Sequence, residues 1–198
     1  MIEFIELNNS APYNLFLDKY NSALLNDEPN IEAVSISSFN KDSNEVHARI
    51  VNLKYINNTD WIFFSNYNSQ KSKDFKNHNQ ITAIFFWKSI KTQVILKAKI
   101  RKTDKKFSDT HFLKRSRDKN ALAISSNQSN IIDSYQNVQR NYNKIFNTKK
   151  ILKRPKYWGG FSFVPYYFEF WEGHDSRINR RKVFNSTDNG WQEYLLEP

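Results

Sequence analysis

The sequence predicts a mainly β fold with added helices: one antiparallel β-barrel with helices at its periphery. Three observations favour this class. Short alternating or aromatic-rich runs follow one another closely between residues 33 and 100. A second series of such runs occupies residues 161–195. Helical spacing is confined to a few segments before and between these two series, as expected for helices at the edge of a barrel.

The first half of the chain contains two expected helices and five expected strands. Apolar residues recur at helical spacing from Asn14 to Leu25, directly after Pro12, which favours a helix there. The polar residues 69–77 are expected to form a short helix between strands. The strands are expected at residues 33–39, 48–55, 61–65, 81–87 and 93–100. The polar cluster at 57–60 favours a hairpin turn between the second and third of them.

The second half of the chain is expected to begin with helices and to return to strands. Thr103 and Asp104 offer a helix cap, after which residues 105–117 are typical of a basic helix. Residues 130–146 are typical of a second, polar helix. The final strands are expected at residues 161–164, 167–171, 182–185 and 191–195. Asp-Asn-Gly at 188–190 favours a tight turn between the last two.

Composition excludes several classes of protein. The 198 residues include no cysteine, which excludes disulfides, thiolate metal sites and a cysteine nucleophile. All four glycines lie in the last forty residues, which excludes the usual glycine-rich loops of Rossmann and P-loop proteins. The four histidines have no metal-ligand spacing, and no Gly-x-Ser-x-Gly elbow occurs. Without an apolar run of membrane length or a basic signal-peptide region, the expected compartment is the cytoplasm.

The net charge of +10 favours an anionic partner: nucleic acid, an acidic membrane surface or a small phosphorylated ligand. Residues 97–119 hold ten Lys and Arg against three Asp, a tract that would suit nucleic acid. However, the basic residues of this tract alternate with apolar ones, a pattern typical of a half-exposed strand and helix. A small phosphate fits better, because Arg49, Lys54, Ser65 and Lys71 occur at the ends of neighbouring expected elements. Side chains at these positions can converge on one phosphate at one end of a sheet.

Several short strings occur in a fixed order along the chain. Arg-Ile-Val-Asn-Leu-Lys stands at 49–54, Phe-Ser-Asn at 64–66 and Ser-Gln-Lys at 69–71. Further strings stand at 92–94, 115–118, 128–129, 158–161, 169–173, 177–181 and 190–198. In order and spacing, from about residue 12 to the last residue, they resemble the pyridoxine/pyridoxamine 5′-phosphate oxidase family.

The resemblance implies a single FMN-binding split-barrel domain over residues 1–198 that forms a homodimer, with residues 158–198 contributing to the dimer interface. It implies an oxidase that transfers a hydride from a pyridoxine or pyridoxamine phosphate to FMN and then passes the electrons to O2. The implied partners are a second copy of the chain and a small phosphorylated or acidic substrate. Neither nucleic acid nor a membrane is expected as a partner, and no metal site is implied.

By position, the resemblance implies three groups of site residues. The FMN-binding residues of one subunit would be Arg49, Lys54, Phe64, Ser65, Gln70 and Lys71. Those supplied by the partner subunit would be Gln93, Gln128, Ser129, Trp171 and Arg181. The substrate would meet Lys54, His111, Arg115, Lys119, Arg177 and Asn179, of which the last two form the catalytic pair beside the reacting carbon.

Four of these positions depart from the family pattern. Gln70 replaces an Arg, His111 a Tyr, Lys119 a Ser and Asn179 a His. His111 and Lys119 can still donate a hydrogen bond to a phosphate, whereas the amide of Asn179 cannot titrate as a histidine does. The departures keep three alternatives open. They are an FMN oxidase of this family with another substrate, such as a phenazine-type precursor, a non-catalytic flavin-binding protein, and a basic nucleic-acid-binding module.

Overall fold

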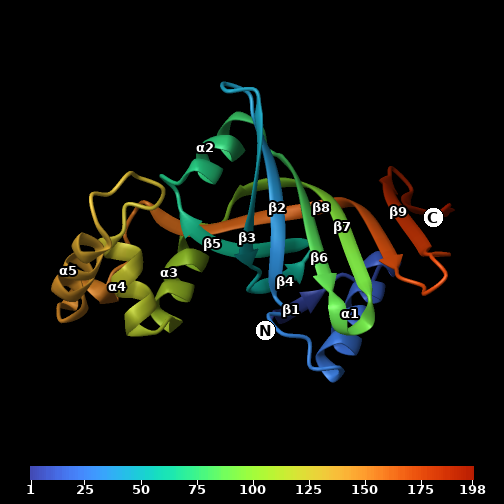
Figure 1. Ribbon diagram of the computed structural model, residues 1–198, viewed down its shortest axis with the longest axis horizontal. Helices are drawn as coiled ribbons and strands as arrows, with labels where there is room; N and C mark the ends of the chain where they lie inside the picture. Colours follow the sequence, from blue (N-terminus) through green and yellow to red (C-terminus); the bar gives the residue numbers. More distant parts are fainter.

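The computed structural model describes residues 1–198 and consists of one ten-stranded sheet with five α-helices around it (Figure 1). The strands are β1 (Glu3–Leu7), β2 (Ala33–Asn40), β3 (Glu45–Asn52), β4 (Tyr55–Asn58), β5 (Asp60–Asn66), β6 (Gln80–Trp87), β7 (Thr92–Lys102), β8 (Trp158–Glu172), β9 (Arg180–Thr187) and β10 (Gly190–Leu196). The helices are α1 (Ala11–Leu25), α2 (Gln70–Asn77), α3 (Lys105–Lys114), α4 (Arg117–Ser125) and α5 (Tyr135–Phe146), with short 3₁₀ turns η1 (Lys88–Ile90) and η2 (Lys149–Leu152).

The predicted antiparallel β architecture is confirmed. The strands follow the order β1-β4-β5-β8-β7-β6-β2-β3, and β9 pairs with both β8 and β10. Every pair is antiparallel except β1 with β4. Both expected hairpin turns are present, one between β4 and β5 and one between β9 and β10. Figure 1 shows α3, α4 and α5 gathered at one end of the molecule and β9 at the other.

Strand β8 joins the two ends of the sheet. Its first half pairs with β5, its second half pairs with β9, and β7 pairs with it from Phe161 to Glu172. The sequence favours two strands here, interrupted at Pro165 and Tyr166, but the structure has one. The interruption is a β-bulge: Lys97 pairs with Tyr167 and Ala98 with Pro165, so Tyr166 is the extra residue. Proline lacks the backbone N–H that a regular ladder requires, and a bulge accommodates it.

The start of β8 requires glycine because two other segments press against it. A Cβ atom at Gly159 would lie 2.2 Å from the hydroxyl oxygen of Tyr67, and one at Gly160 would lie 2.5 Å from Oγ1 of Thr103. The hydroxyl of Tyr67 donates to the carbonyl of Gly160 in this space. The glycine pair therefore lets β8 pass directly beneath the segments that lead into α2 and α3.

Other element boundaries differ from the sequence expectation for local reasons. The strand expected at 48–55 is divided, because Leu53 and Lys54 turn away and donate their N–H groups to the carbonyls of Glu32 and Ile62. The expected helix 105–117 ends at Lys114, and α4 begins after the extended residue Arg115. Helix α5 starts later than expected, and β1 has no counterpart in the sequence reading.

The core is aromatic and lies between α1 and the inner face of the sheet. The ring centroid of Phe16 on α1 lies 4.4 Å from that of Trp61 on β5 and 5.4 Å from that of Phe85 on β6. On β7 the alternating residues Val94 and Leu96 are completely buried, as their spacing predicts. None of the helices has both the length and the apolar character needed to cross a membrane.

Two leucines of opposite exposure test this description of the core. Leu96→Ala is expected to lower the free energy of unfolding by about 2–5 kcal/mol, because Leu96 is 0% exposed and its removal leaves a cavity. Leu25→Ala is the matched control, since Leu25 is 85% exposed at the end of α1 and should change stability by roughly 0.5 kcal/mol or less. Urea unfolding measures both. Equal losses in the two variants would contradict the assigned burial.

Candidate functional site

A cavity of about 830 Å³ opens between β3, the end of β5, the start of α2 and the helices α3 and α4. Its charged lining consists only of cations: no Asp or Glu side chain faces it. The six basic residues are Arg49, Lys54, Lys71, Lys114, Arg115 and Lys119. Neighbouring cations repel one another in a partly desolvated space, and a bound anion relieves this repulsion. The cavity, called the basic cavity below, therefore has the chemistry of an anion site.

Lys71 supplies the most deeply placed charge of the basic cavity. Its side chain is buried, with 9% of the residue exposed, and it forms no ion pair. The ammonium donates to the hydroxyl oxygens of Ser65, at 3.1 Å, and Ser69, at 3.4 Å. Burial lowers the pKa of Lys71, and the charge of Arg49 lowers it further. A buried ammonium with only hydroxyl partners is costly unless an anion joins it.

Arg49 reaches the same region from β3. Its Nη1 donates to the carbonyl of Ile36 at 3.1 Å and to the hydroxyl of Ser38 at 2.7 Å. Its Nη2 pairs with the carboxylate of Asp74 at 3.1 Å. Gln70, at the start of α2, also donates to Asp74 and so is turned toward this carboxylate.

His111 on α3 forms part of an aromatic wall of the basic cavity. Its ring stacks on Phe64 with centroids 3.6 Å apart and an interplanar angle of 9°. Trp158 lies on the same stack, and the Nδ1 atom of His111 is 2.8 Å from the hydroxyl of Tyr55. Burial, together with Arg115 and the neighbouring lysines, lowers the pKa of His111 to about 4. The imidazole is therefore neutral near pH 7 and serves as a hydrogen-bonding ring.

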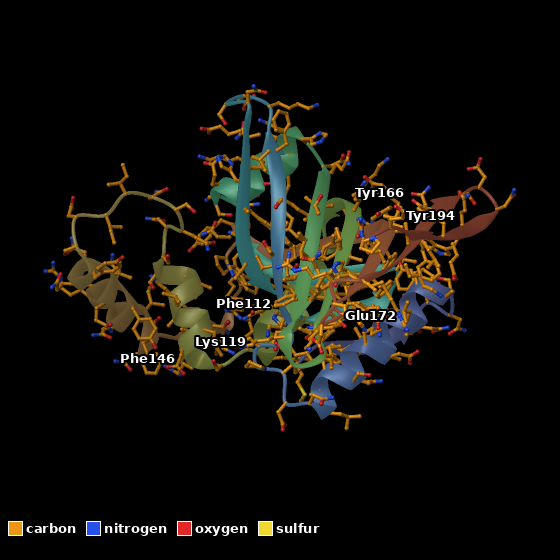
Figure 2. The ribbon with its side chains drawn as sticks, turned by 45° about the vertical axis from the view of Figure 1, so that its right-hand side comes forward. Phe112, Lys119, Phe146, Tyr166, Glu172 and Tyr194 are labelled. Carbon is orange, nitrogen blue, oxygen red and sulfur yellow. The ribbon has the colours of Figure 1, made fainter.

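Three further cations lie at the rim of the basic cavity: Arg115, Lys54 and Lys119. The guanidinium of Arg115 lies over the ring of Trp158 at 4.2 Å and donates to Oδ1 of Asn120. Burial lowers the pKa of Arg115 to about 10, which still leaves it charged near neutrality. The ammonium of Lys54 forms an ion pair with Glu32, with Nζ 3.4 Å from Oε1. Lys119 is exposed at the helical end of the molecule (Figure 2).

Gln128 and Ser129 join this group rather than the one to which the resemblance assigns them. Both line the basic cavity, and Oε1 of Gln128 accepts a hydrogen bond from the hydroxyl of Ser65 at 3.3 Å. The segment that follows α4 returns over the end of β5 and brings them there within one chain. Within one chain, they therefore lie with Ser65 and apart from the other residues that the resemblance assigns to the partner subunit.

A second cavity, of about 530 Å³, lies at the other end of the sheet. It contains Trp171, Arg177 and Asn179. Gln93 and Arg181 are the register partners of Trp171 on the two flanking strands, so all three side chains emerge on one face of the sheet. The structure thus brings together five of the residues that the resemblance assigns to the partner subunit or to catalysis.

The loop that carries Arg177 is held by its own hydrogen bonds. Gly173 donates its N–H to the carbonyl of Lys91, and His174 donates its N–H to the side chain of Asn179 at 3.1 Å. The amide oxygen of Asn179 is therefore engaged within the loop, which leaves its NH₂ group to face outward. Arg177 adopts a left-handed backbone conformation with φ of 60°. Such a conformation is uncommon for a non-glycine residue and is found where the surroundings impose it.

Arg181 has a carboxylate partner within this chain. Its Nε and Nη2 atoms lie 2.8 and 2.7 Å from Oε1 of Glu169, and the hydroxyl of Tyr167 donates to the other oxygen of Glu169. Glu169 is 5% exposed, whereas the side chain of Arg181 is half-buried, so a buried carboxylate holds a partly exposed guanidinium. The side chain of Arg181 is held against the sheet and is not free to move toward the basic cavity.

The two groups of candidate residues are therefore separated in one chain. The basic cavity adjoins α3 and α4, and the second cavity adjoins β9. Figure 2 likewise shows Lys119 at the helical end and Tyr194 of β10 at the opposite end. No single chain can bring both groups to one small ligand.

The sequence reading missed several residues of the basic cavity and its support. Lys114, Tyr55 and Trp158 line it or hold its wall, and Asp74 anchors Arg49 from behind. Trp158 lies within a recognised string and could have been assigned from it. Asp74 carries no local signal, because its partners on β2 are 34 and 36 residues away in the chain.

His111 makes a testable contribution to the pH dependence of stability. Its pKa of about 4 in the folded protein lies below the ordinary value of 6.5, so between these values the unfolded chain binds the extra proton. The free energy of unfolding should therefore fall as the pH falls from 7 to 5, by about 1–2 kcal/mol from this residue after allowance for solvent screening. Urea unfolding at several pH values should show a shallower dependence for His111→Gln. An unchanged slope would contradict a neutral, buried His111.

Comparison with known proteins agrees with these observations. Residues 158–198 match the family model of the pyridoxine 5′-phosphate oxidase C-terminal dimerisation region. The chain is 35% identical over 192 residues to the pyridoxine/pyridoxamine 5′-phosphate oxidase of Christiangramia forsetii, with 94% of this chain and 88% of that protein covered. It is 32% identical over 190 residues to the protein of the same name from Pelagibacter ubique, with 94% and 89% covered.

Solved structures share the fold. PhzG from Burkholderia lata, determined in complex with tetrahydrophenazine-1-carboxylic acid, gives a TM-score of 0.90 at 19% identity and covers 96% of this chain and 93% of that one. A pyridoxamine 5′-phosphate oxidase-related, FMN-binding protein from Nostoc punctiforme gives 0.76 at 9% identity, with 96% and 100% covered. These likenesses confirm the split-barrel fold. From the identity to the curated relatives over nearly the whole chain, the protein belongs to the pyridoxine/pyridoxamine 5′-phosphate oxidase family.

Proposed function

We propose that the protein is a homodimeric, FMN-dependent oxidase that acts on a small phosphorylated or acidic substrate, with a pyridoxine or pyridoxamine phosphate as the first candidate. The observation that carries this proposal is the basic cavity, in which six cations face a space without a carboxylate. Its volume of about 830 Å³ is in the range of small-molecule and cofactor sites. The relatives, which include pyridoxine/pyridoxamine 5′-phosphate oxidases and an FMN-binding protein, supply the candidate chemistry.

The inner part of the basic cavity fits the phosphate of FMN. Lys71 is a buried ammonium without a carboxylate partner, and Ser65 adds a hydroxyl beside it. Arg49 presents a guanidinium whose position is already set by three acceptors. A phosphate would replace the missing counter-charge and receive charge-assisted hydrogen bonds from these side chains. Gln128 and Ser129, from the segment after α4, are the remaining polar groups at this end.

The outer part fits the anionic group of a substrate. Arg115, Lys54 and Lys119 supply three cations there, and neutral His111 supplies a hydrogen-bonding ring. The stacked wall of Phe64, His111 and Trp158 offers a flat aromatic surface to a planar ring. A phosphorylated pyridine combines both features in one molecule.

A second copy of the chain would complete the site. Residues 158–198, which match the dimerisation region of the family, include Trp171, Arg177, Asn179 and Arg181. Phe86, which pairs with Gln93 on the same sheet face, is 59% exposed in the single chain. An exposed aromatic next to a row of polar site residues is typical of a surface that another subunit covers.

Bound FMN would accept a hydride from the substrate carbon and return the electrons to O2. The residues of this chain would orient the substrate and stabilise charge. The cations of the basic cavity would hold the substrate phosphate and exclude alternative orientations. The amide of Gln93 and the guanidinium of Arg181 would stabilise negative charge that develops on the cofactor during reduction. Arg177 would lie beside the reacting carbon, with the amide of Asn179 as a hydrogen-bond donor that does not titrate.

A second candidate is an oxidase of this family with a different anionic aromatic substrate, such as a phenazine-type precursor. Two observations favour it. His111 forms part of the aromatic wall and is hydrogen-bonded to Tyr55. The amide oxygen of Asn179 accepts a hydrogen bond from the backbone of its own loop. Both residues stand at positions that would meet the substrate.

Reconstitution with FMN and anaerobic reduction test the proposal. The apoprotein is expected to bind FMN at micromolar concentration or better and to turn yellow. Pyridoxamine or pyridoxine phosphate should bleach the bound flavin in the absence of O2, and absorbance at the flavin band measures this. Bleaching only by an aromatic carboxylate would select the second candidate. A flavoprotein that no reductant in the panel bleaches would be a non-catalytic flavin protein, and a protein that binds no FMN would contradict the proposal.

Arg177 provides a test of the catalytic assignment. Arg177→Ala should slow the reduction of bound FMN by at least about tenfold while leaving FMN affinity unchanged, because Arg177 would act on the substrate. Arg140→Ala is the control, since Arg140 is exposed on α5 outside both cavities. Stopped-flow absorbance measures the reduction rate. Normal reduction by Arg177→Ala would remove this residue from the catalytic pair.

A further inference from the structure

One buried carboxylate lies directly behind the cations of the inner basic cavity. Asp74, on the third residue position after Lys71 in α2, is 0% exposed. Its two oxygens are contacted by five side chains at 2.9–3.1 Å, from Ser38 and Asn40 on β2, His47 and Arg49 on β3, and Gln70 on α2. A carboxylate offers about four lone-pair sites, so Asp74 is saturated. It does not line the cavity and cannot itself contact a ligand there.

This carboxylate is ionised in the folded protein. Burial alone would raise its pKa, but the hydrogen bonds from Ser38, His47, Asn40 and Gln70 outweigh that effect and lower the pKa. Asp74 therefore offsets the charge of Arg49 and leaves Lys71 as the buried cation without a contacting counter-charge. The two cations beside the proposed phosphate thus differ: one is paired and the other is not.

Asp74 also determines which donors Arg49 can offer. A guanidinium has five N–H donors. Both on Nη1 are used by Ile36 and Ser38, and one on Nη2 is used by Asp74. The Nε–H and the second Nη2–H have no partner in the chain. Because three acceptors fix the plane of the guanidinium, these two remaining donors have a defined direction.

The same residue ties α2 to the sheet. Through Asp74, the helix that carries Gln70 and Lys71 is hydrogen-bonded to β2 and β3. Asp74 therefore links the helix that carries Lys71 to the strand that carries Arg49. A second carboxylate, Asp42 in the turn between β2 and β3, accepts a hydrogen bond from Asn77 at the far end of α2, away from the cavity.

We propose that Asp74 is a positioning residue for phosphate recognition: it orients Arg49 and seats Lys71 so that the inner basic cavity distinguishes a phosphorylated flavin from an unphosphorylated one. This inference rests on the proposed FMN function. For the replacement of Asp74 by a neutral residue, positioning and charge predict opposite changes in the affinity for phosphate. Replacing Asp74 by a neutral residue makes the region more positive, which by Coulomb attraction would strengthen phosphate binding. Loss of positioning would weaken it.

The test compares FMN and riboflavin binding by the full-length apoprotein, measured by quenching of flavin fluorescence. Asp74→Asn is expected to weaken FMN binding by about tenfold or more and to leave riboflavin binding unchanged, because only FMN carries the phosphate. Ser38→Ala removes one acceptor of Arg49 while keeping Asp74, and should weaken FMN binding to a smaller extent, again without an effect on riboflavin. Asp109→Asn is the control, since Asp109 pairs with Arg154 outside the cavity.

Two results for Asp74→Asn would overturn the inference. One is FMN binding that is unchanged or tighter. The other is an equal loss of FMN and riboflavin binding in a folded variant, which indicates a general structural role. If circular dichroism shows that Asp74→Asn is unfolded, the FMN-to-riboflavin ratio of Ser38→Ala takes its place, and an unchanged ratio overturns the inference.

The experiment also distinguishes a failure of the proposed FMN function from a failure of the positioning role. A wild-type protein that binds neither flavin contradicts the FMN proposal itself. In that case inorganic phosphate is the probe, and the rise in melting temperature that it causes is compared between the wild type and Asp74→Asn. A smaller rise in the variant supports the positioning role, and an equal rise overturns it.

Discussion

The structure depends on one electrostatic constraint, which is that several cations are held around a single cavity with no facing carboxylate. Charges of like sign in a desolvated space are unfavourable, and the three most buried cations are each stabilised in a different way. Arg49 is paired from behind by Asp74, Lys71 is bonded to two serine hydroxyls, and Arg115 lies on the face of Trp158. His111 avoids the problem by remaining neutral. An anionic ligand would offset the positive charge that remains around the cavity.

The architecture of the sheet explains how these side chains meet. The cations come from segments distant in the sequence, namely the end of β3, the start of α2, and the region from α3 to α4. Strand β8 links this end of the molecule to the opposite one, because β5 pairs with its first half and β9 with its second half. The same strand therefore carries Trp158 beside the basic cavity and Trp171 beside the second cavity. The two cavities therefore lie at opposite ends of one strand.

The surplus of positive charge in the composition acquires a more specific meaning in the structure. Six of the basic residues surround the basic cavity, and others are neutralised locally, as Arg154 is by Asp109 and Arg181 by Glu169. Much of the tract from Lys97 to Lys106 lies on exposed positions of β7 and α3 and takes no part in either cavity. Charge clustered in one cavity points to a small anion more strongly than net charge does.

Local sequence patterns were enough to predict the β-rich class, the alternation of β7 and both hairpin turns, and the resemblance to a family supplied nearly every candidate site residue. These features depend on the chemistry of neighbouring residues, or on short motifs whose order and spacing resemble those of the family. Only the tertiary structure decided that β8 is continuous across Pro165, that Gln128 lies with Ser65, and that Arg49 is anchored by Asp74. Local patterns contain no information about partners that lie 25 to 63 residues apart, because such contacts form only when distant strands and helices pack together. The separation of the two cavities follows from the length and direction of β8, which no local pattern records.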